Sequence, residues 1–205
     1  MTTYIALLRA VNLGPHNKIG MSDLRELLTG LGMQGVQTLL QSGNAVFQSD
    51  ARTTAPLERL IEDAAANQLH VETDVMIRSH KEWKGIIASN PFRKEARQDP
   101  SHLLVLPLKG SPGRGAAGAL QAAIIGHEVI RVDGRCAYIV YPDGIGRSKL
   151  TSALIEKKLG TRGTARNWNT VLKLDALADS MPRQRGKLNP FVALTRTRHG
   201  GAAQN

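Results

Sequence analysis

The chain has 205 residues, 41% of them hydrophobic and 21% charged, with a formal net charge of +10 and one cysteine. This length and balance fit one large globular domain or two small ones, and exclude a short domain that depends on disulfides to fold. One cysteine cannot form a disulfide within the chain, and no apolar run reaches membrane-spanning length, so we expect a soluble cytoplasmic protein with no membrane partner.

Positive charge is concentrated at the C-terminal end of the chain. Residues 182–205 hold five basic residues and no acidic one, and we predict that this segment is a basic, mostly irregular tail. Excess positive charge suits a partner that carries phosphate, either a small molecule or a nucleic acid. It is more often a feature of a solvated protein surface with a loose basic tail, and we favour that interpretation.

The first part of the chain alternates strand and helix patterns. Four leucines at the spacing of one helical face follow Ser22, which is expected to cap their helix, and Ser79 with Glu82 forms a capping box for another. The sequence QSGN between two short strands indicates a hairpin. The predicted elements are strand 4–9, a helix from Ser22 to Gly32, strands 36–40 and 45–48, a helix from Thr54, strand 72–78 and a short helix after Ser79.

The same order of elements returns after the stretch RKEARQDPS, which we expect to be a polar linker. The dipeptide DG between two of the later strands is typical of a type I′ hairpin turn. The predicted elements are strand 103–108, helix 116–125, strands 129–133 and 136–141, helix 148–159, strand 164–167 and a closing helix.

These elements predict an α+β protein of two ferredoxin-like βαββαβ halves packed together, with a linking helix and a C-terminal helix. The first half with its linking helix spans residues 1–90, and the second with its closing helix spans 91–181. The strands YIALLR, HLLVLPL and CAYIVY are apolar without alternation, which indicates that both faces of each sheet are covered. This argues against an RNA-recognition domain, which has the same order but exposes aromatic residues on an open sheet face.

Polar residues gather at one edge of each predicted sheet. In this topology the end of the first strand and the hairpin after the second lie at the same edge, as do the ends of the third and last strands of the second half. In the second half, a glycine turn, GIGRSK, would then precede a helix N-terminus, an arrangement that binds anions. The candidate ligand-binding residues are Asn12, Lys18, Gln41, Ser42 and Asn44 at the first edge, and Arg147, Ser148, Lys149, Arg166, Asn167, Trp168 and Asn169 at the second.

Each of these residues also has a structural interpretation. GIGRSK does not have the spacing of a phosphate-binding P-loop, and Trp168 suits a core position as well as a stacking wall for a ring. Asn167 and Asn169 suit helix caps or turns, and Arg166 can pair within the protein. Cys136 lies in a strand and is expected to be an inert buried thiol. The sequence shows no Cys/His spacing of a metal site and indicates no cofactor.

Several motifs, taken in order, resemble one bacterial family. They are YIALLRAVNLG, NKIGMSDLRELLTGLG, LQSGNAVF, YPDGIGRSKL and TARNWNTVLKL, and they extend from about residue 3 to about residue 180. The sequence is similar to the family known as domain of unknown function 1697. That resemblance implies two ferredoxin-like halves and implies no activity. The family's typical opening, LRGIN.GG, has paired glycines where this chain has Leu13, Gly14 and Pro15.

Three functions are compatible with these patterns. The first is binding of a phosphate-bearing ligand, a nucleotide or an RNA end, by Arg147, Lys149 and Arg166, with Trp168 stacking on it. The second is an enzyme acting on a phosphorylated small molecule, with His16 or Lys18 carrying a proton. The third is a structural or interaction protein in which both polar clusters only tie the halves together.

Overall fold

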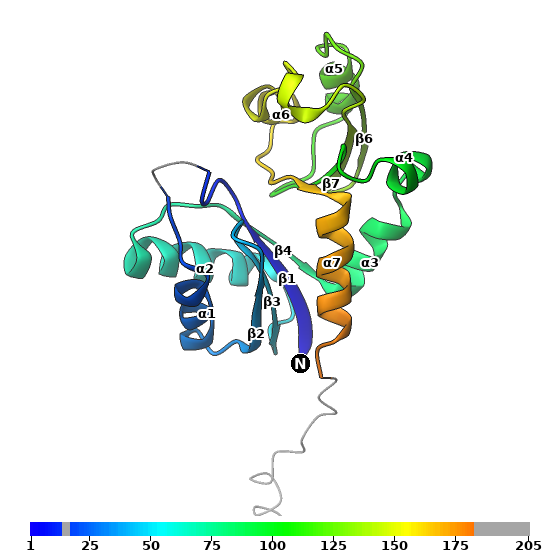
Figure 1. Cartoon of the computed structure of the whole chain (residues 1–205). Helices are drawn as coiled ribbons and strands as arrows, with labels where there is room; N and C mark the ends of the chain where they lie inside the picture. Colours follow the sequence, from blue (N-terminus) through cyan, green and yellow to red (C-terminus); the bar gives the residue numbers. More distant parts are fainter. Residues whose placement is uncertain (14–16, 183–205) are drawn as a thin grey trace, which may run out of the picture.

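The structure is a computed structural model that describes residues 1–13 and 17–182. It contains two four-stranded antiparallel sheets with helices packed against them, one in each half of the chain (Figure 1). The α+β class and the presence of two similar halves are therefore confirmed. Most of the predicted basic tail, residues 183–205, lies outside the described residues.

The first half follows the predicted order of elements. Its strands are hydrogen-bonded in the order β2-β3-β1-β4, so that β1 and β2 both run antiparallel to β3. Its elements are β1 (Thr2–Leu8), α1 (Met21–Gly30), β2 (Gln34–Leu39), β3 (Asn44–Ser49), α2 (Thr54–Leu69) and β4 (Val75–Ser79).

The second half repeats this strand order as β6-β7-β5-β8. Two helices, α3 (His80–Ala88) and α4 (Arg93–Gln98), connect the halves, and α7 (Trp168–Asp179) closes the chain. The remaining elements are β5 (Leu103–Pro107), α5 (Ala116–Gln121), β6 (Val129–Asp133), β7 (Cys136–Val140), the 3-10 turn η1 (Ile145–Arg147), α6 (Ser152–Leu159) and β8 (Arg166–Asn167).

Both faces of each sheet are covered, as the apolar strands predicted. On β1, Tyr4 and Ala6 pack towards α1 and α2, whereas Ile5 and Leu7 enter a central cluster with Trp83 of α3. That central cluster also takes residues from β5, β7 and α7, so the two halves share it. In Figure 1, α3 and α7 run along the side of the first sheet, between the two halves. The contact between the halves is thus a hydrophobic core to which both halves contribute.

A buried ionic network also crosses this contact. Arg78 of β4, which is 4% exposed, donates hydrogen bonds to the carbonyls of Leu108 (2.7 Å) and Arg135 (2.9 Å). Lys109, after β5, lies 3.1 Å from the buried carboxylate of Glu58 on α2. Burial, and then the positive charge of Arg135, lower the pKa of Arg78. These charges are compensated by hydrogen bonds across the contact, as buried charges require.

Several predicted helix boundaries are wrong. Helix α1 begins at Met21 with Gly20 as its N-cap, while the Ser22 hydroxyl bonds Asp23 instead. Helix α5 ends at Gln121, four residues before the predicted end. The stretch expected to be a polar linker contains α4. The six-residue helices α4 and α5 have little apolar periodicity, so the sequence pattern could not define their ends.

Two local signals have different outcomes. The capping box is confirmed, since the Ser79 hydroxyl accepts from the Glu82 backbone and the Glu82 side chain accepts from the Ser79 backbone. The type I′ turn is wrong. Gly134 has a positive φ of 53°, but Arg135, the second central residue, is not among the described residues with positive φ, and a type I′ turn needs both.

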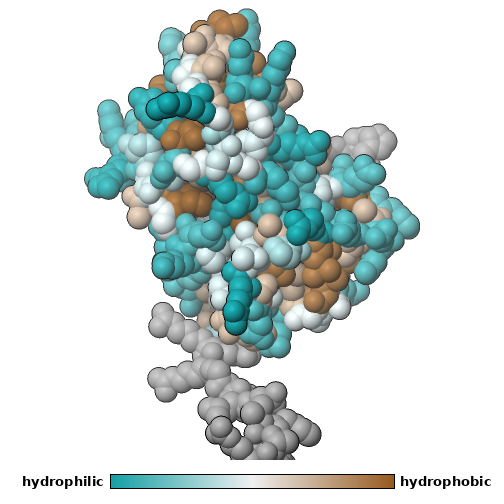
Figure 2. All heavy atoms as spheres, turned by 180° about the vertical axis from the view of Figure 1, so that it is seen from behind, coloured by the Kyte–Doolittle hydropathy of each residue, from teal (hydrophilic) through white to brown (hydrophobic). Residues whose placement is uncertain are grey.

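The face of the molecule drawn in Figure 2 is mostly hydrophilic. Seen from behind, hydrophobic residues gather in separate patches among polar ones (Figure 2). Among the described residues, no helix combines the length and apolar composition needed to cross a membrane.

Candidate functional site

Arg166 joins the two halves of the chain. It lies on β8 of the second half, and its guanidinium group reaches the end of β1 and the β2–β3 hairpin of the first. All five guanidinium N–H bonds donate hydrogen bonds. Nε donates to the side-chain oxygen of Asn44, one terminal nitrogen to Thr164 Oγ1 and the Ala165 carbonyl (both 2.8 Å), and the other to the carbonyls of Leu8 (3.0 Å) and Ser42 (2.8 Å).

The acceptors of Arg166 are all neutral. Its side chain is buried, with the residue 9% exposed, and no carboxylate of residues 1–13 or 17–182 forms an ion pair with it. Burial lowers its pKa to about 10, so the group still carries its positive charge at neutral pH. The junction therefore holds a buried cation whose hydrogen bonds are satisfied but whose charge has no acidic partner in the described part of the chain.

The β2–β3 hairpin is shaped to receive Arg166. Asn44 is fully buried, and its amide donates to the Leu39 carbonyl (2.9 Å) and the Ser42 hydroxyl (2.9 Å), which turns its oxygen towards Arg166. Gly43 has a φ of 69°, and a Cβ at this position would lie 2.8 Å from the Cβ of Leu8. Only glycine allows this close approach of the hairpin to the end of β1.

Asn12 ties the loop after β1 to the same hairpin. Its amide nitrogen donates to the carbonyls of Gln41 (2.7 Å) and Ile19 (3.0 Å), and its side-chain oxygen accepts from the Ile19 backbone (2.9 Å). The end of β1 and the hairpin are thus neighbours, as the strand order predicted. The side chains of Gln41 and Lys18 are exposed, and His16 lies outside the described residues.

A cavity of about 680 Å³ opens beside Arg166. It lies between the end of β1, helix α6 and the outer face of the second sheet. One wall is apolar and includes Val11, Leu104, Leu106, Ile139, Leu150 and Ile155. The polar lining residues are Arg9, Ser42, Tyr141, Ser152, Glu156, Thr164, Arg166, Asn167 and Thr170.

Two residues of the cavity lining, Arg9 and Glu156, form an ion pair. Arg9, the residue after β1, donates through Nε (2.8 Å) and a terminal nitrogen (2.9 Å) to the two carboxylate oxygens of Glu156 on α6. This bidentate pair connects the two halves and neutralises both charges. Neither residue was predicted as a site residue from the sequence, although Arg9 ends the first predicted strand at the edge where the site was expected.

Tyr141 is a lining residue whose hydroxyl is neutral. The residue is 3% exposed, and burial, followed by the negative charge of Glu128, raises its pKa to about 12. The hydroxyl therefore keeps its proton at neutral pH and can donate a hydrogen bond. Ser42, Ser152 and Thr170 are further lining residues that carry a hydroxyl group, and Arg166 is in the same lining.

The GIGRSK segment differs from the sequence prediction. Residues 145–147 form η1, and α6 begins only at Ser152, capped by the Thr151 hydroxyl. The Ser148 hydroxyl instead bonds the Glu128 carboxylate and accepts from the Leu150 backbone (3.0 Å). The predicted helix start at residue 148 is therefore wrong. Arg147 and Lys149 are exposed and do not line the cavity.

The remaining candidates lie at the start of α7. Asn167 is the N-cap of this helix and accepts from the Thr170 backbone (2.9 Å), which is one of the structural roles considered for it. Trp168 is buried in the central cluster, and Asn169 is exposed. Of the twelve candidates, the cavity therefore brings together Ser42, Arg166 and Asn167, with Asn44 directly behind Arg166.

The fold and the site define an α+β protein of two similar halves with a cavity between them. The chain matches the model of the family described as protein of unknown function (DUF1697) over residues 1–138, and it belongs to that family. A conserved bacterial protein of Streptococcus pneumoniae, SP0830, has a similar solved structure, with a TM-score of 0.66 and 21% identity over 86% of this chain and 98% of that chain. At that identity the likeness concerns the fold alone. No curated protein matches the chain.

Proposed function

We propose that the chain binds a small organic anion in the cavity between its halves. The observation that carries this proposal is the buried Arg166 cation in the cavity wall, which has neutral acceptors and no carboxylate partner among residues 1–13 and 17–182. A phosphate-bearing ligand, such as a nucleotide or an RNA end, belongs to this class.

The dimensions and lining of the cavity support a ligand with an apolar body. Ligand sites are typically concave, mostly apolar, and carry a few convergent polar groups. The volume of about 680 Å³ lies within the usual range of small-molecule pockets. The aliphatic wall from β5, β7 and α6 faces a ring or chain, while the hydroxyl groups near Arg166 can donate to the charged end.

Electrostatics favour an anion over a neutral ligand. Two unit charges about 8 Å apart attract by about 2 kcal/mol when the effective dielectric constant is about 20. Arg9 and Glu156 cancel each other's charge, so Arg166 sets the sign of the potential in the cavity. All N–H groups of Arg166 already donate to protein acceptors. The hydroxyls of Ser42, Tyr141 and Thr170 would therefore form the direct hydrogen bonds to the ligand.

A structural role for Arg166 is favoured by its five hydrogen bonds, and the two roles are compatible. Arg166 then holds the halves together and charges the cavity at the same time. For an enzyme, the described part of the lining offers one carboxylate, Glu156, and this is already paired with Arg9. Ligand binding without a catalysed reaction is therefore better supported than an enzyme function.

Two finer sequence predictions accompany this proposal. The strand orders β2-β3-β1-β4 and β6-β7-β5-β8 support two ferredoxin-like units, with the βαββαβ order in each. The single cysteine, which is buried, supports a location in a reducing cytoplasm.

The test uses anilinonaphthalene sulfonate, an aromatic anion, titrated calorimetrically into the full chain. Ser152 is exposed at the start of α6 and lines the cavity, so Ser152→Trp should obstruct the cavity with little cost to folding. Ala153→Trp is the matched control, because Ala153 is exposed but does not line the cavity. We expect saturable binding to one site, at least about tenfold weaker in Ser152→Trp and unchanged in Ala153→Trp. Equal binding by both variants, or none by the wild type, would refute the proposal.

A further inference from the structure

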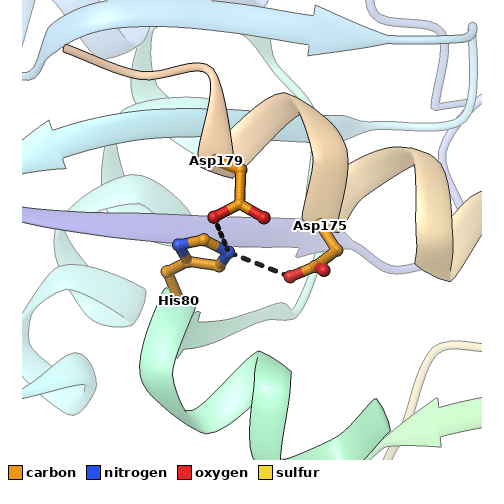
Figure 3. A group of neighbouring side chains, drawn as sticks. All are labelled: His80, Asp175 and Asp179. Atoms are coloured by element: carbon orange, nitrogen blue, oxygen red, sulfur yellow. Dashed lines mark hydrogen bonds and ion pairs between the residues drawn. The ribbon is translucent and has the colours of Figure 1, made fainter.

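A second cluster of polar side chains lies where α3 meets α7, and none of its residues lines the cavity. Nε2 of His80, the first residue of α3, lies 2.9 Å from an oxygen of Asp175 and 3.8 Å from an oxygen of Asp179 (Figure 3). Both aspartates project from α7 towards the imidazole. One potential ligand atom from each of the three residues lies within 4.8 Å of the others.

We propose that His80, Asp175 and Asp179 bind a divalent transition-metal ion, with Zn²⁺ the best match to their chemistry. One imidazole nitrogen and two carboxylate oxygens form a donor set that Zn²⁺ accepts, and three protein ligands leave a fourth position for water. Bonds of about 2.0–2.1 Å in a tetrahedron place ligand atoms about 3.3 Å apart. The observed separations bracket this value, so small side-chain movements suffice.

The position of the two aspartates on α7 is a second, independent reason to expect a cation. They are four residues apart, so they share one helical face and repel each other. They also lie in the last two turns of the helix, where the helix dipole disfavours negative charge. Two acids placed there destabilise α7 unless a cation neutralises them.

Lys84 now supplies part of that neutralisation. Its ammonium nitrogen lies 2.9 Å from the second oxygen of Asp179 and 3.7 Å from that of Asp175. The hydrogen bond to Asp179 is the main cause that raises the pKa of Lys84. Half of this side chain is exposed, so it can swing into solvent when a metal ion arrives. Losing an exposed ion pair of this kind costs little.

A bound ion would link α7 to α3. Because α7 belongs to the second half and α3 follows the first, the ion would strengthen the contact between the halves. The two helices already pack together, with the indole of Trp83 donating to the Val171 carbonyl (3.1 Å). An ion held only by the folded chain would stabilise that contact by mass action.

The experiment is a calorimetric titration of the chelator-treated full chain with Zn²⁺. We expect one ion per chain and at least about tenfold weaker binding in Asp175→Asn and in His80→Ala. His127→Ala is the matched control, since it removes an exposed histidine from another His–Asp pair and should leave this binding unchanged. Co²⁺ should give visible d–d absorption that Asp175→Asn removes.

Lys84→Met separates metal binding from folding defects. It removes the competing ammonium and should tighten Zn²⁺ binding, a gain that a damaged fold cannot produce. The proposal is overturned if the wild type binds no Zn²⁺, or if Asp175→Asn and His80→Ala bind it as tightly as the wild type. Unchanged Zn²⁺ affinity in Lys84→Met would refute the idea that the Lys84 ammonium competes with the metal ion for Asp175 and Asp179.

Discussion

The guanidinium of Arg166, on the last strand of the second half, donates through Nε to the side-chain oxygen of Asn44, at the start of β3 in the first half. The two residues are 122 positions apart in the sequence. The same guanidinium also bonds the carbonyls of Leu8 and Ser42. One side chain therefore holds together the end of β1, the β2–β3 hairpin and β8, and forms part of the cavity wall.

Arg166→Gln should lower the free energy of unfolding by about 3 kcal/mol. The shorter side chain leaves the Asn44 oxygen and the carbonyls of Leu8 and Ser42 without their donor, at about 1 kcal/mol for each lost hydrogen bond. Urea denaturation of both proteins measures the difference. Arg147→Gln is the control, because Arg147 is exposed and its replacement should change stability by less than about 0.5 kcal/mol. Equal midpoints for the two variants would contradict a structural role for Arg166.

The Arg9–Glu156 pair should couple the two halves weakly. A double-mutant cycle with Arg9→Met and Glu156→Gln should give an interaction energy of about 1 kcal/mol, because both side chains are partly exposed. Added salt should reduce this energy by screening. A coupling indistinguishable from zero at low salt would mean that the bidentate contact contributes nothing to the inter-half contact.

The thiol of Cys136 should resist alkylation in the native protein. Burial raises its pKa to about 12, so at pH 8 almost none of it is thiolate, the reactive form. Iodoacetamide labelling, followed by mass spectrometry, should be at least about 1000-fold slower in the native chain than in urea. Comparable rates in the two conditions would show that the strand is accessible.

Residues 1–90 expressed alone should fail to form a well-ordered domain. Ile5, Leu7 and Trp83 would lose their partners in β5, β7 and α7, which share the central cluster with them. We expect an aggregating or molten fragment that lacks near-ultraviolet circular dichroism. Sharp, dispersed amide signals in a proton–nitrogen NMR spectrum of the fragment would contradict a shared core.

Which segments lie next to each other within one half could be predicted from the sequence. The proximity of Asn12 to the hairpin follows from the strand order, and the bond from Asn12 to the Gln41 carbonyl confirms it. The sequence was insufficient wherever two halves or two distant helices meet. Nothing local to Asn44 or Arg166 indicates that they pair, because that contact depends on how the halves pack.

Local competition between side chains explains other differences. Ser148 was predicted to begin a helix, but its hydroxyl bonds Glu128 and the Leu150 backbone, and α6 begins at Ser152 with Thr151 as its cap. The cluster around His80 has no recognisable metal-binding spacing in the sequence, because its two aspartates come about 95 positions later, on a different helix.

The most direct test of the central claim compares two ligands that share an aromatic body, one with a sulfonate group and one without a charge. Anilinonaphthalene sulfonate and its uncharged parent, phenylnaphthylamine, are titrated against the native chain and against Ser152→Trp, with near-ultraviolet circular dichroism to confirm native packing. The Arg166 charge predicts that the anion binds the cavity about tenfold or more tightly than the neutral amine, and that Ser152→Trp weakens the binding of both. Equal or tighter binding of the neutral amine would contradict an anion-selective cavity.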